Sequence, residues 1–308
     1  MFTPRAENPA LAVALMILAS ALLAGTSLLA KAVGAGHLGP ALHPLQISHG
    51  RFLFAALAIG TVFALLRPRL GVIHWRLHVT RTALGWSGVT LMFAAVAFLP
   101  LGDATAISFL NPVFAMVLAI PLLGEKVGPV RWAAAGIALC GAVILLRPGG
   151  GAVQLAVLLA LGAALLMGAE LIAIKKLSGR EAPLQILTIN NAMGLAISSL
   201  AVVWVWAPPS AGQWAALAGL GLMMALAQTC FLNAMARADA SFVTPFSYLT
   251  LVFATGYDAL VFAVRPDAVS LTGAGVILAG AGLLAWRQAR PAARRAGDSK
   301  PCTLAKDG

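Results

Sequence analysis

The heptapeptide FLNPVFA at residues 109–115 returns as YLTLVFA at residues 248–254, 139 positions later, with four of its seven letters unchanged. A longer segment, LAVALMILASALLAGTSLLAK at 11–31, aligns in the same way with LAVLLALGAALLMGAELIAIK at 155–175, at an offset of 144. A coincidence between short motifs does not extend over segments of this length. The chain is therefore predicted to contain two copies of one structural unit, with small loop insertions that change the offset.

Glycines mark the same repeat further along the chain. At the 139-residue offset, two glycines of GIALCGA coincide with two of GVILAGA: Gly136 and Gly141 with Gly275 and Gly280. Small residues at such positions let helices approach closely in lipid. We predict two halves, at 10–147 and 152–288, with a short N-terminal segment at 1–9 and a disordered basic tail at 289–308.

The composition indicates a membrane protein. Of the 308 residues, 60% are hydrophobic and only 10% are charged, whereas soluble domains carry roughly 25% charged residues. Apolar runs of roughly 18 or more residues, the length needed to cross the bilayer, fill most of the chain. The predicted fold is an all-α integral membrane protein with ten transmembrane helices, near 10–33, 44–66, 79–98, 104–123, 130–147, 152–174, 184–206, 213–235, 241–263 and 269–287.

The distribution of basic residues predicts the orientation in the membrane. With the N-terminus inside, 17 of the 21 Lys and Arg residues fall on the cytoplasmic side, as the positive-inside rule requires. The four on the other side are Lys31, Arg51, Arg147 and Arg265. Both termini are therefore predicted to be cytoplasmic, and the net charge of +11 is assigned to cytoplasmic loops and not to a nucleic-acid partner.

Five helices per half have a further consequence, because an odd number forces the second half to cross the membrane in the opposite sense. Lys31, at the outer end of the first helix, then has its counterpart in Lys175, at the inner end of the sixth. Inverted repeats of this kind are the structural basis of alternating access around a site near the middle of the membrane. The sequence therefore favours a transporter over a channel.

Ionisable residues inside the predicted spans are candidates for coupling or gating, since a charge in hydrocarbon is costly. Asp258 and Glu170 lie inside spans, and Lys31 and Lys175 lie at span ends. We expect Asp258 to titrate with protons or to bind a substrate amine; the alternative for both acids is a snorkelling or salt-bridged side chain. Arg51 could bind a substrate carboxylate, but snorkelling along its methylene stem is favoured.

Uncharged residues supply the other cavity candidates. Pro112 and Pro245 lie within predicted spans, where proline frees a backbone carbonyl and bends a helix. Both are predicted kinks that either line a cavity or serve packing alone. The remaining candidates are large or polar residues inside spans, for which helix packing is the alternative role: Trp86, Asn111, Gln228 and Tyr248.

Two further segments resemble a known family. LPLGDATAISFLNPVFAMVLAIPLLGEKVG at 99–128 and RADASFVTPFSYL at 237–249 are similar to the EamA-type repeat of the drug/metabolite transporter superfamily. The resemblance implies a bacterial inner-membrane permease for small organic metabolites, often an exporter of amino acids or related compounds. It implies no soluble cofactor. The expected partners are the substrate and the lipid bilayer, with protons suggested by the sparse acids inside the spans, and both a monomer and a homodimer are compatible with the sequence.

An intramembrane enzyme is the alternative from another class. Tyr257-Asp258 and Leu101-Gly102-Asp103 echo fragments of aspartyl intramembrane proteases, but their order is reversed and Asp103 falls in a predicted loop. Metalloprotease, serine hydrolase and phosphate-binding motifs are absent from the sequence. The cysteines form neither a metal-ligand spacing nor a disulfide framework. We therefore expect a non-enzymatic protein without a metal.

Overall fold

The computed structural model describes residues 8–68, 70–123, 128–146, 151–178, 180–235, 237 and 244–297. Within these ranges the secondary structure is helical, without a strand. The elements are α1 (Pro9–Gly34), α2 (Pro44–Leu66), α3 (Trp75–Val96), α4 (Leu101–Ser108), α5 (Asn111–Leu123), α6 (Pro129–Leu146), α7 (Gly151–Ser178), α8 (Pro183–Val202), the 3₁₀ turn η1 (Val203–Val205), α9 (Ala211–Met235), the 3₁₀ turn η2 (Thr244–Tyr248), α11 (Leu249–Phe262) and α12 (Ala268–Gly297).

Local sequence signals explain several helix ends. α1 begins where the Asn8 side chain accepts a hydrogen bond from the Leu11 N–H at 3.0 Å, which satisfies one free donor of the first turn. α2 begins at a proline whose missing N–H needs no partner there. The residues that cap the C-terminal ends of α2 and α11 are Arg67 and Ala263, both in the left-handed region, with φ of 42° and 55°. Within the described residues, each predicted span overlaps one helix or two consecutive helical segments.

Two of the predicted spans are interrupted at equivalent places. A turn at residues 109–110 separates α4 from α5, and the 3₁₀ turn η2 precedes α11. Pro112 is the second residue of α5, and Pro245 lies within η2. Phe109 and Tyr248, 139 residues apart, contact each other edge to face at these two interruptions, with ring centroids 5.1 Å apart.

The helices have the length and composition of membrane spans. Among the described residues, six helical stretches are long and apolar enough to cross a bilayer, and three shorter apolar helices accompany them. The long stretches lie in α1, α2, α4 with α5, α7, α8 with η1, and α9; the shorter ones lie in α6, η2 with α11, and α12. The architecture is thus that of an all-helical, multi-pass membrane protein.

The tail is a correction to the sequence-based prediction. α12 continues to Gly297, into the range 289–308 that was expected to be disordered. Alanine and arginine, which are frequent in this segment, are good helix formers, and they extend the helix beyond its apolar part. The remaining residues, 298–308, lie outside the described part of the chain.

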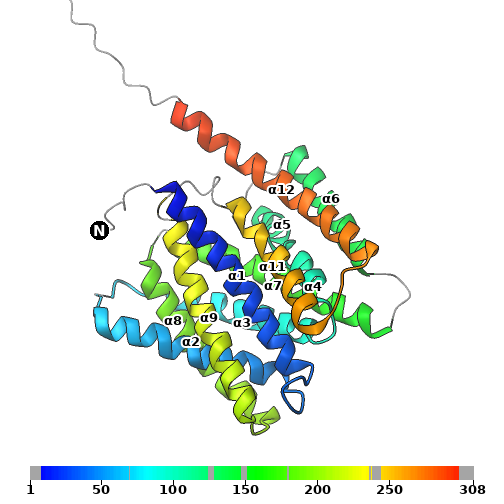
Figure 1. Ribbon diagram of the computed structural model, residues 1–308. Coiled ribbons are helices and arrows are strands. Elements are labelled where there is room, and N and C mark those ends of the chain that lie inside the picture. The colour runs from blue at the N-terminus through cyan, green and yellow to red at the C-terminus, as the bar shows by residue number, and fades with distance from the viewer. Residues whose placement is uncertain are drawn as a thin grey trace, which may run out of the picture.

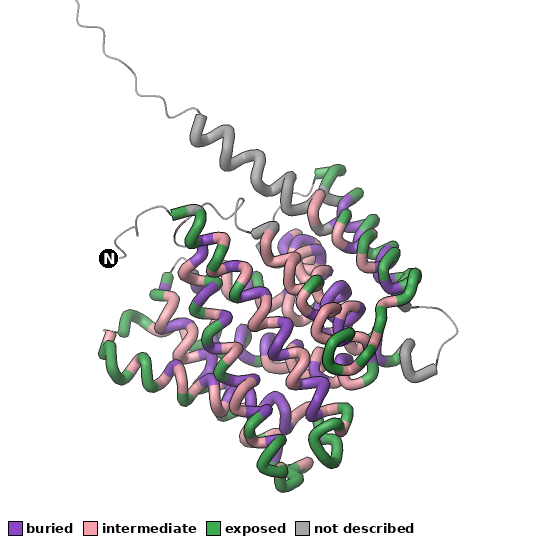
Figure 2. The backbone as a smooth tube through the Cα atoms, in the orientation of Figure 1, coloured by how far each residue is buried: buried purple, intermediate pink, exposed green. Residues whose placement is uncertain are grey.

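Charged groups lie inside the bundle while large apolar side chains cover its outside. Figure 2 shows buried positions along the middle of the helices and exposed ones on the outer faces and at the ends. Leu260 and Trp204 are 85% and 88% exposed, whereas Asp258 and Arg51 are 1% and 4% exposed. This distribution suits a lipid-facing surface around a partly polar interior.

Equivalent helices of the two halves pack against equivalent partners. α1 packs along α9 and α11, and α7 packs along α3 and α5; α1 and α9 lie side by side in Figure 1. In the sequence repeat, α1 corresponds to α7, α9 to α3 and α11 to α5. α2 packs on its own counterpart α8, and α6 packs on its own counterpart α12.

The contact between α6 and α12 is reciprocal at the level of single residues. A Cβ atom on Gly141 would lie 2.7 Å from the backbone nitrogen of Ile277, and one on Gly280 would lie 2.5 Å from that of Ala138. Gly141 corresponds to Gly280 and Ala138 to Ile277 at the 139-residue offset. The contacts are thus reciprocal between equivalent residues, and their order along the two helices makes α6 and α12 antiparallel.

Alanine at Gly141 or Gly280 is expected to destabilise the protein, because the added Cβ would overlap the facing backbone. Overpacking of this kind typically costs about 1–3 kcal/mol. Gly136 and Gly275 are matched controls on the same helices, since nothing lies within 4 Å of a Cβ there. Melting temperatures of the four variants in detergent check the prediction. Equal melting temperatures for the Gly141→Ala and Gly136→Ala proteins would contradict the close contact.

Candidate functional site

A buried ion pair joins the two halves at one end of the bundle. Lys31 Nζ on α1 lies 2.6 Å from Asp258 Oδ1 on α11. The second carboxylate oxygen of Asp258 accepts a hydrogen bond from the Leu101 N–H, at 2.8 Å, at the first residue of α4. One carboxylate from the second half therefore holds two helices of the first half. Of the two roles expected for Asp258, the salt-bridged alternative describes this structure.

Two helix ends favour the charges of this ion pair: Lys31 lies at the C-terminal end of α1, and the Asp258 carboxylate lies at the N-terminal end of α4, where Leu101 donates its N–H. Lys31 lies in the last turn of α1, where the helix dipole attracts a cation, and its Nζ is 5.1 Å from the centroid of the Phe262 ring. α11 ends four residues after Asp258, whose backbone oxygen accepts hydrogen bonds from the N–H groups of Ala263 and Val264. The chain thus turns sharply next to the ion pair.

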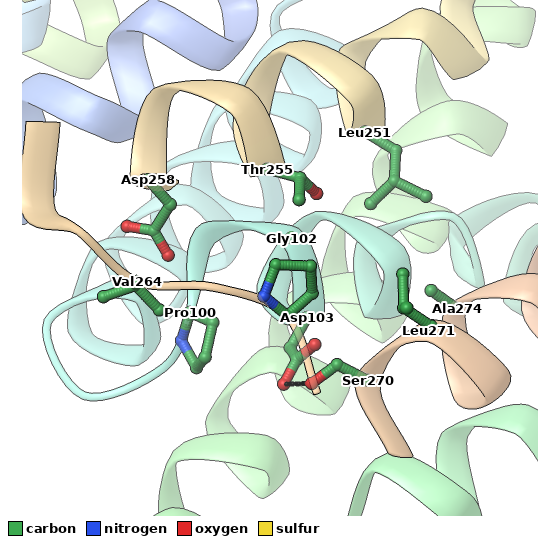
Figure 3. Close-up of a pocket in the computed structure, with 11 residues that line it drawn as sticks. Pro100, Gly102, Asp103, Leu251, Thr255, Asp258, Val264, Ser270, Leu271 and Ala274 are labelled. Atoms are coloured by element: carbon green, nitrogen blue, oxygen red, sulfur yellow. Dashed lines mark hydrogen bonds between the residues drawn. The ribbon is translucent and has the colours of Figure 1, made fainter. Parts of the chain in front are cut away.

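A small pocket adjoins this ion pair. It has a volume of about 60 Å³, far below the several hundred Å³ of a metabolite site. Asp258 and Thr255 on α11 and Asp103 on α4 line it, and Ser270 Oγ donates a hydrogen bond to Asp103 Oδ2 at 2.9 Å (Figure 3). Asp103 lies in the first turn of α4, not in the predicted loop, because the helix begins directly after Pro100.

Two equivalent glutamines bridge the halves at opposite ends. Gln46 accepts a hydrogen bond from the Ala207 N–H at 3.2 Å and donates one to the Ala207 carbonyl. Gln185, 139 residues further on, accepts from the Gly71 N–H at 2.8 Å and donates to the Val72 carbonyl at 3.5 Å. Each amide therefore ties the start of α2 or α8 to a loop of the other half.

A cluster around Glu181 adds to the bridge made by Gln185. The Glu181 carboxylate accepts hydrogen bonds from the His74 N–H at 2.8 Å and from Gln185 Nε2 at 2.7 Å. His74 Nδ1 and His78 Nε2 lie 2.9 and 2.8 Å from its two oxygens. Burial acts to raise the pKa of Glu181, but these hydrogen bonds outweigh it and lower the pKa to about 2.

A second charged cluster lies within the bundle, between α2, α3 and α7. Arg81 Nε on α3 is 3.5 Å from Glu170 Oε1 on α7, and Arg81 Nη1 donates to the Ile186 carbonyl at 3.2 Å. Arg51 on α2 is buried and interacts electrostatically with Glu170 and Arg81. The expectation that Arg51 snorkels is wrong, because the residue is buried and its guanidinium carbon lies 4.4 Å from the centroid of the Phe52 ring.

The uncharged candidates occupy inner faces of several helices. Trp86 Nε1 and Gln228 Oε1 are buried, without a hydrogen-bond partner among the described residues, and both therefore retain capacity to bind a ligand or a water. Asn111 is the first residue of α5, with its backbone oxygen close to Gly168, and Tyr248 contacts Phe109. The side chain of Lys175 and that of Pro245 lie outside the described part.

Sequence reasoning missed Arg81, Glu181 and the histidines that bind Glu181. His74 and His78 are four residues apart, the spacing that places two side chains on one helix face, so their proximity was readable. Their common partner Glu181 could not be predicted from the sequence, because it lies 107 residues beyond His74. In the part of the chain that the structure describes, no group of three His, Cys, Asp or Glu side chains is arranged to hold a metal ion.

Comparison with known proteins identifies relatives over most of the chain. The model of the EamA-like transporter family matches residues 10–147 and 154–286. A riboflavin transporter of Rhizobium johnstonii is 36% identical over 212 residues, 66% of this chain and 68% of that protein. An S-adenosylmethionine uptake transporter of Rickettsia felis is 27% identical over 258 residues, 83% and 88% of the two chains. A solved structure with 22% identity has a TM-score of 0.60 over 92% of this chain and 98% of its own, which supports the fold.

Replacement of Glu181 by glutamine is expected to lower the melting temperature at pH 7, because a hydrogen bond to a charged group contributes about 1.5–3 kcal/mol. The pKa of about 2 lies below the ordinary 4.5, so the stabilisation is complete above pH 4.5 and is lost as the pH falls towards 2. The difference between wild type and Glu181→Gln should therefore narrow over this range in detergent melts. A difference that stays constant from pH 7 to pH 3 would rule out this ionised cluster.

Proposed function

The chain belongs to the EamA-like transporter family, and we propose that it moves its substrate by alternating access between two inverted five-helix halves. It is a membrane transporter of small molecules rather than an enzyme, as the family and the relatives' names indicate. We further propose that the two halves are related by a two-fold axis and that the chain has ten membrane spans. Its orientation in the membrane and the position of its closed gate are also proposed.

The observation that carries the proposal is the reciprocal contact between equivalent residues. Gly141 meets Ile277 as Gly280 meets Ala138, and α6 and α12 run antiparallel where they touch. Two equivalent helices that are antiparallel at a mutual contact are related by a two-fold axis perpendicular to them. Such an axis would lie in the membrane plane, and the two halves would then exchange conformations to open either side.

The proposed orientation follows from the basic residues, with both termini in the cytoplasm of a bacterial cell and the chain in its inner membrane. α1 then runs outward, and the Lys31–Asp258 ion pair closes the outer end of the bundle. The position equivalent to Asp258 in the first half is Ala119, which cannot form the matching pair at the inner end. We therefore assign this conformation to a state that is closed towards the outside.

Opening to the outside then requires Lys31 to separate from Asp258. A lone charge left inside the bundle is costly, so water, a proton on Asp258 or the arriving substrate must replace the lost partner. Asp258 is in this account a gating residue, and protons are the proposed coupling ion. Glu170, held by Arg81, belongs to the central charged cluster, and Lys175 is proposed at the inner gate.

The substrate is proposed to be a small organic molecule that binds between the halves, near Trp86, Asn111, Gln228 and Tyr248. The relatives carry riboflavin and S-adenosylmethionine by name, which makes these two compounds the first to test. An amino-acid cargo and the export direction remain predictions of the family resemblance.

Reconstitution into liposomes tests the proposed function. Vesicles preloaded with unlabelled riboflavin or S-adenosylmethionine should take up the same labelled compound by exchange, with a saturable rate. The Gly136→Ala protein, which changes no contact, should match the wild type, and empty liposomes should show no exchange. Absence of exchange for both compounds and for a mixture of amino acids, in tight vesicles holding folded protein, would contradict a carrier.

A further inference from the structure

The central charged cluster contains two guanidinium groups and one carboxylate. Arg51, Arg81 and Glu170 come from α2, α3 and α7, and Arg51 Nη1 has no hydrogen-bond partner among the described residues. Arg81 Nε likewise has none, because its 3.5 Å approach to Glu170 is an ion pair without a hydrogen bond. Buried charges are normally both paired and hydrogen-bonded. Arg51 Nη1 and Arg81 Nε are therefore donors that can each bind a further acceptor.

The other described acids do not supply the missing acceptor. Asp258 is bound to Lys31, Asp103 accepts from Ser270, and Glu181 is surrounded by its histidine partners. Asp267, just before α12, accepts from the Ser270 N–H. The charges that act on Arg51 are Glu170, which attracts it, and Arg81, which repels it. Among the described residues, the cluster thus carries one excess positive charge inside a bundle whose outer surface is apolar.

The same two helices lead from this cluster to a basic hollow. The hollow, of about 580 Å³, is lined by residues of α3 and α7 and by the adjoining loop residues, among them Arg76, Lys176 and Arg180. Arg81 lies on α3 beyond Arg76, and Glu170 lies on α7 before Lys176. A mouth with three positive charges concentrates anions in front of a site, and this mouth is at the end that we assign to the cytoplasm.

We propose that the transported substrate is an organic anion, and that Arg51 and Arg81 bind its carboxylate or phosphate group inside the bundle. This inference rests on the proposed transport function and names its substrate class. An oxyanion supplies the acceptors that Arg51 Nη1 and Arg81 Nε lack. It competes with Glu170 for the guanidinium groups, so that substrate release restores the Arg81–Glu170 pair.

Glu170 and Trp86 have defined roles in this account. The Glu170 carboxylate occupies the space in front of Gly85, where a Cβ would lie 2.7 Å from its Cδ, and it serves as the internal counterion when the site is empty. Trp86, the next residue on α3, has a free indole N–H for a further acceptor on the substrate. Neutral compounds of the same shape would leave the excess positive charge uncompensated.

The test uses pairs of compounds that differ by one anionic group: riboflavin 5′-phosphate against riboflavin, and S-adenosylmethionine against its decarboxylated analogue. Affinities for the purified wild type are measured by thermal shift and tryptophan fluorescence. In at least one pair the member that carries the phosphate or the carboxylate should bind about tenfold more tightly, as expected for a charge-assisted hydrogen bond. Arg51→Gln should reduce this preference to about twofold or less, and Arg51→Lys should retain part of it.

Glu170→Gln should change affinity in the opposite direction, because it removes the internal competitor, and a gain cannot arise from misfolding. Arg265→Gln, at an exposed arginine in the loop between α11 and α12, removes the same charge elsewhere and should leave the preference unchanged. Equal affinity for both members of each pair, no binding of any of them, or a preference that survives in Arg51→Gln would overturn the proposal. Exchange of neutral riboflavin in liposomes would then still support a carrier, whereas anion binding without exchange of any compound would contradict the carrier and keep the anion site.

Discussion

The cost of placing a charge inside hydrocarbon is the constraint on which the rest of this structure depends. The bundle exposes leucine and tryptophan side chains on its outer faces, so every charge within it needs a partner. Asp258 has Lys31 and the Leu101 N–H, and Glu170 has Arg81. Because these partners come from different halves or different helices, each charge also fixes how the helices stand relative to one another.

The contacts that the two halves share, and those that only one half makes, both bear on the proposed transport mechanism. Equivalent glutamines bridge the halves at both ends, and equivalent glycines form the contact between α6 and α12. Two buried acids do not follow this symmetry: Asp258 has Ala119 as its counterpart, and Glu181 has Leu42. A shared scaffold with different closures at its two ends can therefore favour one conformation at rest while the other remains accessible.

Much of the fold was readable because hydropathy and repetition are local properties of the sequence. The helix ranges followed from apolar runs, and the interruptions before α5 and α11 coincide with prolines. Lys31, Asp258 and Glu170 stood out because charges are rare in such runs. Their partners could not be read, since Lys31 and Asp258 are 227 residues apart and only packing brings them together. The burial of Arg51 depends on the helices packed around α2, among them α8 and α9, which its position in the sequence does not reveal.

The central claim is that the two ends open in opposition, and spin-label distances test it most directly. Labels at Ala35 and Val261 report the outer end, and labels at Lys176 and Leu122 report the inner end; Leu122 and Val261 are equivalent at the 139-residue offset, and all four are exposed. In Asp258→Asn, the account predicts a larger population with a long outer distance and an equally larger population with a short inner distance. An outer distance that lengthens while the inner one stays unchanged would contradict alternating access between the two halves.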